Sequence, residues 1–208
     1  MSCILRIHWA ITPEIAPQPL INCNRCGGVK AYRCSGKFRV NANGKCIDVW
    51  LIYRCVDCDN SWNFGIFERC NRRDIEPALL RALESNHPGL ARRHAFDIVA
   101  LRNQVGRVEE FADVALRKMV VNGTRENASV LELRLGLETP TSLRLDRLLA
   151  NELGISRSRL QALEERRLLI VDPDEAKAMR KPARQGMTVR VDLAGEPDRE
   201  AIICAAGG

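Results

Sequence analysis

The 208-residue sequence predicts a mixed α+β protein in three parts. Two C-x-x-C pairs flank a strand-rich stretch near the N-terminus, and eight of the ten aromatic residues precede residue 70. After residue 73 the apolar residues recur mainly at helical spacing. We therefore expect a cysteine-bearing β-hairpin domain at 1–72, a helical connector ending in a strand at 73–139, and a small α/β domain with a C-terminal tail at 140–208.

The composition excludes several classes of protein. With 46% hydrophobic and 28% charged residues, the chain lies near the globular average, which excludes disordered and fibrous proteins. No apolar run approaches the roughly 18 residues that a membrane-spanning helix needs. The N-terminal stretch carries Arg6, His8 and Glu14 where a signal peptide would be apolar. We therefore expect a cytoplasmic protein with no membrane partner.

The net charge of +6 suggests an anionic partner, because a field of one sign raises the local concentration of the other sign. Compositional bias is the alternative explanation. Of the 32 basic residues 26 are arginine, as a GC-rich genome would produce without selection for binding. Charge alone therefore leaves the partner open.

Four cysteines have the spacing of a metal site. Cys23 and Cys26 form one C-x-x-C pair, and Cys55 and Cys58 form the other. A two-residue spacer lets both sulfurs of a pair reach one ion at about 2.3 Å. Four thiolates would close the coordination sphere of zinc and leave no position for water, so we expect a structural zinc site.

The stretch between the two pairs predicts a β-hairpin. Strands are expected at 37–40 and 46–53, with a turn at 41–44. The hairpin would run out from the first pair and back to the second, which is the arrangement of a zinc ribbon. Gly27 and Gly28 favour this arrangement, because a backbone that curls around the sulfurs needs residues that tolerate positive φ.

The nine cysteines could serve purposes other than zinc binding. A disulfide framework would be expected to have an even number and an export signal, and a thioredoxin-like motif would lie near a βαβ pattern. We expect three further cysteines to be buried and to behave as small apolar residues: Cys34, Cys46 and Cys70. The alternative is that Cys34 or Cys70 replaces one of the four predicted zinc ligands. Cys3 and Cys204 suggest no role.

The middle of the chain predicts three helices and a strand. Helices are expected at 77–83, with a proline in the first turn, at 90–105 and at 108–121. Leucines that alternate with polar residues predict a half-buried strand at 130–137. Pro140 then breaks the strand and indicates a domain boundary.

The last domain predicts two short helices joined by Gly-Ile-Ser. A stripe of leucines predicts a helix at 145–153, which Gly154 ends. Ser156 is placed to cap a second helix at 157–166. These helices would present basic side chains on their outer surfaces.

A strand pair at 168–171 and 188–193 is expected to back the two helices. The basic residues that we predict to bind an anionic partner are Arg144, Arg147, Arg157, Arg159, Arg166, Lys181 and Arg184. The alternative is a small helix pair with solvated arginines and no partner.

The segment 36–45, together with 48–55 and the Trp-Asn pair at 62–63, resembles a bacterial family of uncharacterised proteins, the domain of unknown function number 1062. The resemblance would cover most of the chain. It implies no activity, because none is described for the family.

The sequence Arg-Leu-Asp at 144–146, followed by Gly-Ile-Ser-Arg at 154–157, resembles an RNA-binding domain named after the fourth small-subunit ribosomal protein. This domain also occurs in tyrosyl-tRNA synthetases, pseudouridine synthases and a ribosome-rescue heat-shock protein. The match covers about 143–193. It implies a helix pair whose basic face lies against structured RNA.

Carried over to this chain, the resemblance implies that Arg144, Arg157 and Arg159 contact RNA, while Asp146 positions the first helix. The chain departs from the family at two places. Arg167 stands where the family usually has glycine, and Asp-Pro-Asp-Glu replaces the family's Asn-Gly hairpin after the first strand. The second departure places acidic residues beside the expected RNA-binding face.

We expect a zinc-stabilised RNA-binding protein that is not an enzyme, because no catalytic triad, open metal site or phosphate loop is found. No aromatic residue follows Phe111, so the last domain has no ring on which an unpaired base could stack. The expected partner is therefore a folded or double-stranded RNA, such as ribosomal or transfer RNA. The alternative is a protein-interaction adaptor with a structural zinc ribbon and no nucleic-acid role.

Overall fold

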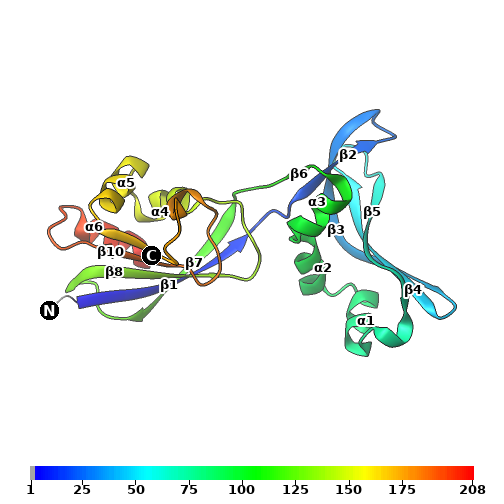
Figure 1. Ribbon diagram of the computed structural model, residues 1–208, viewed down its shortest axis with the longest axis horizontal. Coiled ribbons are helices and arrows are strands. Elements are labelled where there is room, and N and C mark those ends of the chain that lie inside the picture. Colours follow the sequence, from blue (N-terminus) through cyan, green and yellow to red (C-terminus); the bar gives the residue numbers. More distant parts are fainter. Residues whose placement is uncertain (1–2) are drawn as a thin grey trace. The chain divides into compact units, whose positions relative to one another are not determined.

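Residues 3–208 form a mixed α+β fold with two sheets and six α-helices (Figure 1). The structure that describes them is a computed structural model. The chain divides into two compact units. The inserted unit is Ile15–Phe111, and the terminal unit joins the preceding segment, up to Glu14, to Ala112–Gly208.

These two units differ from the three domains expected from the sequence. The segments expected as helices at 77–83 and 90–105 pack on the sheet of the inserted unit, whereas the strand expected at 130–137 lies in the sheet of the terminal unit. The first strand of the chain also belongs to the terminal unit, although its residues fall within the domain expected at 1–72. Composition shows which segments are rich in the same kinds of residue, but it does not show which segments far apart in the sequence pair with each other.

The inserted unit is built on a five-stranded antiparallel sheet of order β5-β4-β3-β2-β6. Its strands are β2 (Gln18–Cys23), β3 (Gly28–Asn43), β4 (Cys46–Cys55), β5 (Ser61–Asn71) and β6 (Val108–Glu109). The predicted hairpin is confirmed as β3 and β4, whose register pairs Val40 with Val49. The turn is tighter than predicted, because β3 continues to Asn43 and only Gly44 and Lys45 reverse the chain.

Three helices pack against this sheet. They are α1 (Pro77–Glu84), α2 (Pro88–Ala95) and α3 (Ile98–Val105), preceded by the 3₁₀ turn η1 (Arg72–Asp74). The helix predicted at 77–83 is confirmed. The helix predicted at 90–105 is instead two helices, because Asp97 caps the second of them by accepting a hydrogen bond from the Ala100 N–H at 3.0 Å.

The core of the inserted unit follows from alternation along β4. Every second residue of this strand is buried, and Leu51 and Tyr53 lie in one cluster with Ala91 of α2 and Leu101 of α3. Each such buried side chain contributes about 1.5 to 3 kcal/mol. The residues between them point to the face of the sheet away from this cluster.

The terminal unit is built on a second five-stranded sheet, of order β7-β1-β8-β10-β9. Its strands are β1 (Cys3–Pro13), β7 (Val114–Asn122), β8 (Ala128–Leu137), β9 (Leu169–Asp172) and β10 (Thr188–Asp192). β1 is parallel to β8, and the other pairs are antiparallel. The strand predicted at 130–137 is confirmed as most of β8. The strands predicted at 168–171 and 188–193 are confirmed as the antiparallel pair β9 and β10.

The helix predicted at 108–121 is wrong, since this segment forms β6 and most of β7. Burial along β7 alternates with period two: Leu116 and Lys118 are half-buried, whereas Arg117 and Met119 are exposed. When the apolar residues of a short segment fit both the helical period of 3.6 residues and the strand period of 2, packing against the rest of the protein decides its conformation. Here the segment pairs with β1, which lies far away in the sequence.

The helices of the terminal unit are α4 (Leu145–Leu153), α5 (Arg157–Glu165) and α6 (Arg199–Gly207), with a 3₁₀ turn η2 (Ala178–Arg180). The predicted helix pair is confirmed as α4 and α5. Gly154 ends α4 with a left-handed φ of 67°, and the Ser156 hydroxyl accepts a hydrogen bond from the Arg159 N–H at 3.1 Å.

One buried core joins these helices to the sheet. Leu145, Leu149 and Leu153 of α4 pack in the same cluster as Leu133 of β8. The Trp9 indole N–H donates to the Ala206 carbonyl at 2.9 Å, which ties β1 to α6. Among the residues that the structure describes, no helix is long and apolar enough to cross a membrane.

Candidate metal centre and basic helix pair

The four cysteines of the two C-x-x-C pairs meet at one end of the inserted unit. Their Sγ atoms all lie within 4.8 Å of one another, with 3.5 Å between Cys23 and Cys58 and 3.9 Å between Cys26 and Cys55. A tetrahedral ion about 2.3 Å from each sulfur requires separations of about 3.8 Å. The four thiols could therefore hold a metal ion, as the spacing predicts.

The backbone around each pair is suited to this geometry. The N–H groups of Cys26 and Gly27 both donate to the Cys23 carbonyl, at 3.1 and 2.9 Å. The residue after the second cysteine has a left-handed φ in both pairs, 71° at Gly27 and 57° at Asp59. The prediction that Gly27 permits positive φ is confirmed, and Asp59 adopts the same conformation at a cost that glycine avoids.

Polar groups around Cys23 favour its thiolate form. A hydrogen bond from the Tyr32 hydroxyl lowers the pKa of the Cys23 thiol to about 5, against the opposing effect of burial. The Asn60 side-chain amide also donates to the Cys23 Sγ, at 3.8 Å. Tyr32 and Asn60 were missed by the sequence analysis, because groups that support a ligand have no fixed spacing from it.

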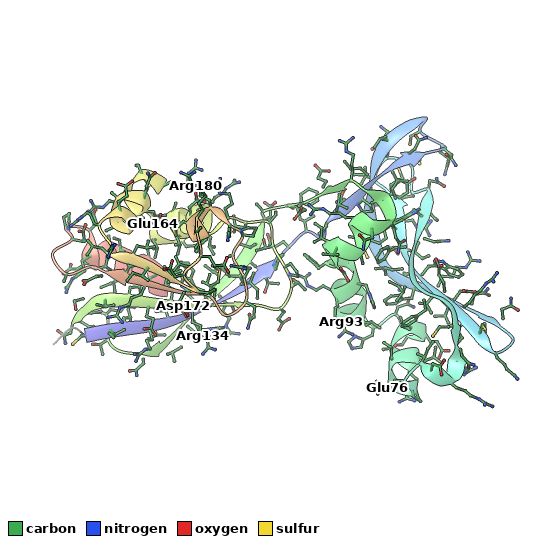
Figure 2. All side chains as sticks on the ribbon, viewed as in Figure 1. Glu76, Arg93, Arg134, Glu164, Asp172 and Arg180 are labelled. Atoms are coloured by element: carbon green, nitrogen blue, oxygen red, sulfur yellow. The ribbon has the colours of Figure 1, made fainter. Side chains whose placement is uncertain are left out.

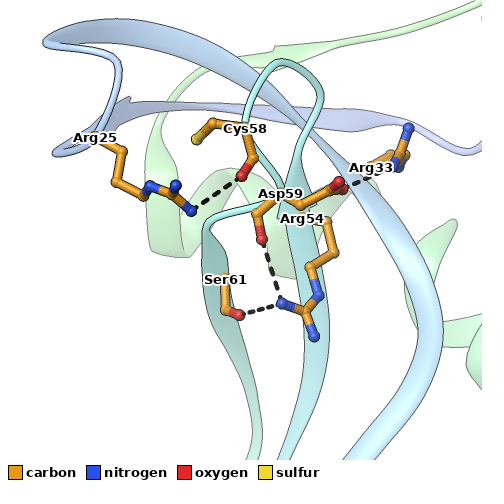
Figure 3. Close-up of polar contacts among 6 residues, drawn as sticks. All are labelled: Arg25, Arg33, Arg54, Cys58, Asp59 and Ser61. Carbon is orange, nitrogen blue, oxygen red and sulfur yellow. Dashed lines mark hydrogen bonds and ion pairs between the residues drawn. The ribbon is translucent and has the colours of Figure 1, made fainter.

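Arginines hold the second cysteine pair in place (Figure 3). Arg33 forms an ion pair with Asp59 at 2.7 Å. Arg54 donates to the Asp59 carbonyl at 3.2 Å and to the Ser61 hydroxyl at 2.7 Å. Arg25 reaches across from the first pair and donates to the Cys58 carbonyl at 3.3 Å.

The other cysteines lie outside this group. The thiols that gather within 4.8 Å do not include Cys34 or Cys70, so neither substitutes for a ligand. Cys34, Cys46 and Cys70 are half-buried rather than fully buried as predicted. Burial nevertheless raises the pKa of the Cys34 thiol, which keeps it protonated.

The seven basic residues predicted to bind RNA all lie in the terminal unit, but they have different surroundings. Arg147 and Arg157 are exposed, on α4 and at the start of α5, and have no ion pair within residues 3–208. Arg144, at the start of α4, donates to Asp146 at 3.1 Å. This contact agrees with the expectation that Asp146 helps to position the first helix.

Arg159 and Arg166 are bound to a carboxylate that the sequence analysis missed. Glu196 is only 8% exposed and pairs with both guanidinium groups, with 2.8 Å to Arg166. Glu196 thus fixes α5 to the segment that follows β10. These two arginines stabilise the fold, and because they share one carboxylate, only half of their charge is left for a partner.

Lys181 and Arg184 are also paired with an acid. Both contact Glu175, at 2.7 and 2.8 Å, and Lys181 and Arg184 together lower the pKa of that carboxyl. Glu175 is the last residue of the acidic stretch that departs from the resembled RNA-binding family. It partly neutralises two of the predicted RNA-binding residues.

Two open pockets flank Arg157. The larger, about 570 Å³, lies between α4, α5 and η2 and has a mixed lining of charged, polar and apolar side chains. It is lined by Arg144, Asp146, Arg157, Leu160, Gln161, Glu164, Glu165, Lys177, Met179 and Arg180. Two of its lining residues, Glu164 and Arg180, are labelled in Figure 2. The smaller, about 270 Å³, is lined by Arg147, Ala150, Asn151 and Arg157. The two free arginines of the helix pair therefore share one groove.

The sequence model of one family, described as a protein of unknown function (DUF1062), matches residues 40–175. The chain belongs to this family. The DUF1062 match begins in β3 of the inserted unit and ends after β9 of the terminal unit, so it spans parts of both. Comparison of this DUF1062 protein with curated proteins and with solved structures found no match.

Proposed function

We propose that this protein is a zinc-stabilised RNA-binding protein without enzymatic activity, and that it binds folded or double-stranded RNA through α4 and α5. The observation that carries the proposal is the groove beside Arg147 and Arg157, two exposed arginines that form no ion pair with an acidic side chain among residues 3–208. Arginine pairs with phosphate in a bidentate geometry and keeps its charge at all relevant pH values.

The order of elements in the terminal unit supports the proposed kinship with the RNA-binding domain of the fourth small-subunit ribosomal protein. Two short helices joined at Gly154 are followed by an antiparallel strand pair, as the resemblance implies. Arg157 and the Arg144–Asp146 pair lie at the ends of the helices that would meet the RNA.

The proposed partner is a folded RNA, such as ribosomal or transfer RNA, because the helix pair offers phosphate contacts and no aromatic ring. No aromatic residue follows Phe111, so α4 and α5 cannot stack an unpaired base except on arginine. Recognition would then depend on shape and on phosphates.

Zinc is the metal that we propose for the four thiols of the inserted unit. The ligand set is Cys23, Cys26, Cys55 and Cys58. Thiolate sulfurs in a tetrahedral arrangement suit zinc or iron, and no fifth group is needed to complete the sphere. The bound ion would stabilise the fold, because four thiolates leave no open coordination position for water.

The helix-pair proposal is tested by binding to a hairpin RNA at several salt concentrations. Replacing both Arg147 and Arg157 with alanine should weaken binding and flatten the dependence of log affinity on log salt by about one unit per lost contact. Stability should change little, because exposed arginines rarely contribute more than about 0.5 kcal/mol.

The matched control is the pair Arg134→Ala and Arg190→Ala. These exposed arginines alternate with buried Leu133 and Val189 on β8 and β10, so they lie on the sheet face opposite α4. Their replacement should leave hairpin binding unchanged. Equal binding by wild type and by the Arg147/Arg157 variant would contradict the proposal.

The second candidate function is a protein-interaction adaptor. The observation that favours it is the lining of the larger pocket, where Asp146, Glu164 and Glu165 stand beside the basic residues. A mixed lining suits a partner that carries both signs of charge. This function would be favoured if, at about 100 mM salt, the protein bound none of the tested RNAs more tightly than a neutral control protein does.

A further inference from the structure

Trp50 lies on the face of the inserted sheet that its helices leave open. On β4 the odd-numbered residues from 47 to 55 are buried toward the helices, and the even-numbered residues point the other way. Trp50 is half-buried and belongs to none of the core clusters. Its large ring is therefore part of the open face of the sheet and not of a core.

The indole N–H of Trp50 faces solvent. It has no hydrogen-bond partner within residues 3–208, and the buried polar side-chain atoms without a partner there are Tyr53 Oη and Arg159 Nε. By contrast, the Trp9 indole N–H is fully buried and bonded to a carbonyl. Trp50 thus offers a ring and a free donor to a partner.

One basic side chain lies beside this ring, and a second lies further along the same strand. Arg39 of β3 pairs directly with Trp50 in the strand register, and its guanidinium carbon lies 6.0 Å from the ring centroid. Arg54, four residues along β4 on the same face, donates only to the uncharged oxygens of Asp59 and Ser61. Neither arginine has an ion pair in the described part of the chain, so both keep their charge for a partner.

One acidic side chain lies on the same face: Asp48, two residues before Trp50 on β4, whose carboxylate accepts a hydrogen bond from the Arg69 N–H at 2.7 Å. Uncharged side chains complete the surface. Ile52 lies between Trp50 and Arg54 on the same face of β4, and it pairs in register with the exposed Asn63 of β5. We name the set Arg39, Trp50, Ile52, Arg54 and Asn63 the Trp50 face. From Trp50 to Arg54 it spans about 13 Å along one strand.

We propose that the Trp50 face binds a short single-stranded RNA segment, with one base stacked on the Trp50 ring and phosphates held by Arg39 and Arg54. Open sheet faces that combine an exposed ring with cations bind unpaired nucleotides in this way, because every base has a flat π-face. β3 and β4 place two arginines and one carboxylate, that of Asp48, on this face, and this excess of positive charge favours an RNA segment over a basic peptide. Asn63 offers both donor and acceptor groups to a base edge.

This surface is independent of the helix-pair proposal, because it lies in the other compact unit. It supplies what the helix pair lacks, namely a ring for an unpaired base. The two surfaces are tested with different RNAs, so either proposal can fail while the other stands.

The experiment measures binding of a fluorescently labelled oligouridine, which has little structure of its own, to the full chain. Trp50→Ala should weaken binding about fivefold or more, which corresponds to loss of one stacked base. Trp50→Phe keeps a ring and should bind within about threefold of wild type. Arg39→Ala should weaken binding and flatten the salt dependence.

Two further measurements separate stacking from a merely structural role. Oligouridine should quench the tryptophan emission of wild type, and the Trp50→Phe variant should bind with little quenching. Of the two tryptophans that remain in this variant, Trp9 is shielded in a core and Trp62 packs with Tyr53 in the cluster on the helix side of the sheet. Arg81→Ala, at an exposed position of α1 on the helix side of the unit, is the matched control and should bind as wild type does.

Equal oligouridine affinity for wild type, Trp50→Ala and Trp50→Phe would overturn the proposal, as would absence of binding to the wild type. If Trp50→Ala loses its fold, judged by near-ultraviolet circular dichroism, the comparison of Trp50→Phe with wild type by quenching still decides. Hairpin RNA binding should be retained by Trp50→Phe. A wild type that binds hairpin RNA but not oligouridine would leave the helix-pair proposal standing alone.

Discussion

At the scale of single residues, Glu196 is the carboxylate on which the position of α5 depends most. It is 8% exposed and holds both Arg159 and Arg166. Replacing Glu196 with alanine should destabilise the terminal unit by about 1.5 to 3 kcal/mol, because hydrogen bonds to charged groups are lost and two guanidinium groups remain side by side. The measurement is amide hydrogen exchange of α5 at increasing urea concentration.

Glu200→Ala provides the control for this prediction. Its side chain is 91% exposed and its contact with Arg199 is long, at 3.7 Å. Its loss should therefore cost less than about 0.5 kcal/mol. If the Glu196 and Glu200 variants resist urea equally, Glu196 does not anchor α5.

Residues that must be of one type at a fixed spacing could be predicted from the sequence. Residues whose role depends on partners far away in the sequence could not. The four cysteines of the metal site were found because thiolate ligands require particular residues at a particular spacing. Glu196 was missed because its partners lie 37 and 30 residues away, at Arg159 and Arg166. The same two arginines were predicted to contact RNA, because the sequence shows which side chains are charged but not which acidic side chains pair with them.

At the scale of elements, the joint between α4 and α5 depends on one glycine. Gly154 has φ 67° and ψ 28°, and a Cβ added there would meet no atom within 4 Å. Gly154→Ala should therefore cost about 1 kcal/mol from backbone conformation alone, without any clash. Thermal unfolding followed by circular dichroism would measure the loss.

Gly154→Asn is the comparison for this variant, because asparagine tolerates the left-handed region better than alanine does. It should restore part of the lost stability. Gly154→Ala with unchanged stability would show that the joint relaxes to another conformation. Hairpin RNA affinity of both variants should follow their folded fraction.

Elements with strong local signals were predicted correctly, whereas the segment 108–121, which pairs with a strand far away in the sequence, was not. The helix at 145–153 has a leucine stripe, a glycine stop and buried leucines that agree with one another. Segment 108–121 has no such agreement, and its conformation depends on the pairing of Ile7 with Val120, which brings β7 beside β1. No local pattern records that pairing.

At the scale of the whole molecule, one compact unit is inserted into the other. The chain leaves the terminal unit after Glu14, just beyond the end of β1. The inserted unit then occupies Ile15–Phe111, and the chain returns to the terminal unit as β7 beside β1. The core of each unit is formed by its own residues. The sequence could not predict this arrangement, because the parallel pairing of β1 with β8 joins segments from opposite sides of the insertion.

Because each unit has its own core, removal of the metal should unfold only one of them. Zinc binding to four thiolates contributes about 10 kcal/mol or more of folding free energy to such a site. We therefore expect about one equivalent of zinc in the purified protein. Strong chelation should abolish hydrogen-exchange protection across 15–111 while 112–208 stays protected, since lengthening a loop twofold costs only about 0.6 kcal/mol.

Cys55→Ser tests the same prediction without a chelator. This variant should bind less zinc and lose protection in the inserted unit, whereas Cys204→Ser, at an exposed position outside the metal group, should behave as wild type does. Retained exchange protection in the chelated inserted unit would contradict a structural role for the metal. Simultaneous unfolding of both units would instead show that the terminal unit depends on the folded insertion between β1 and β7.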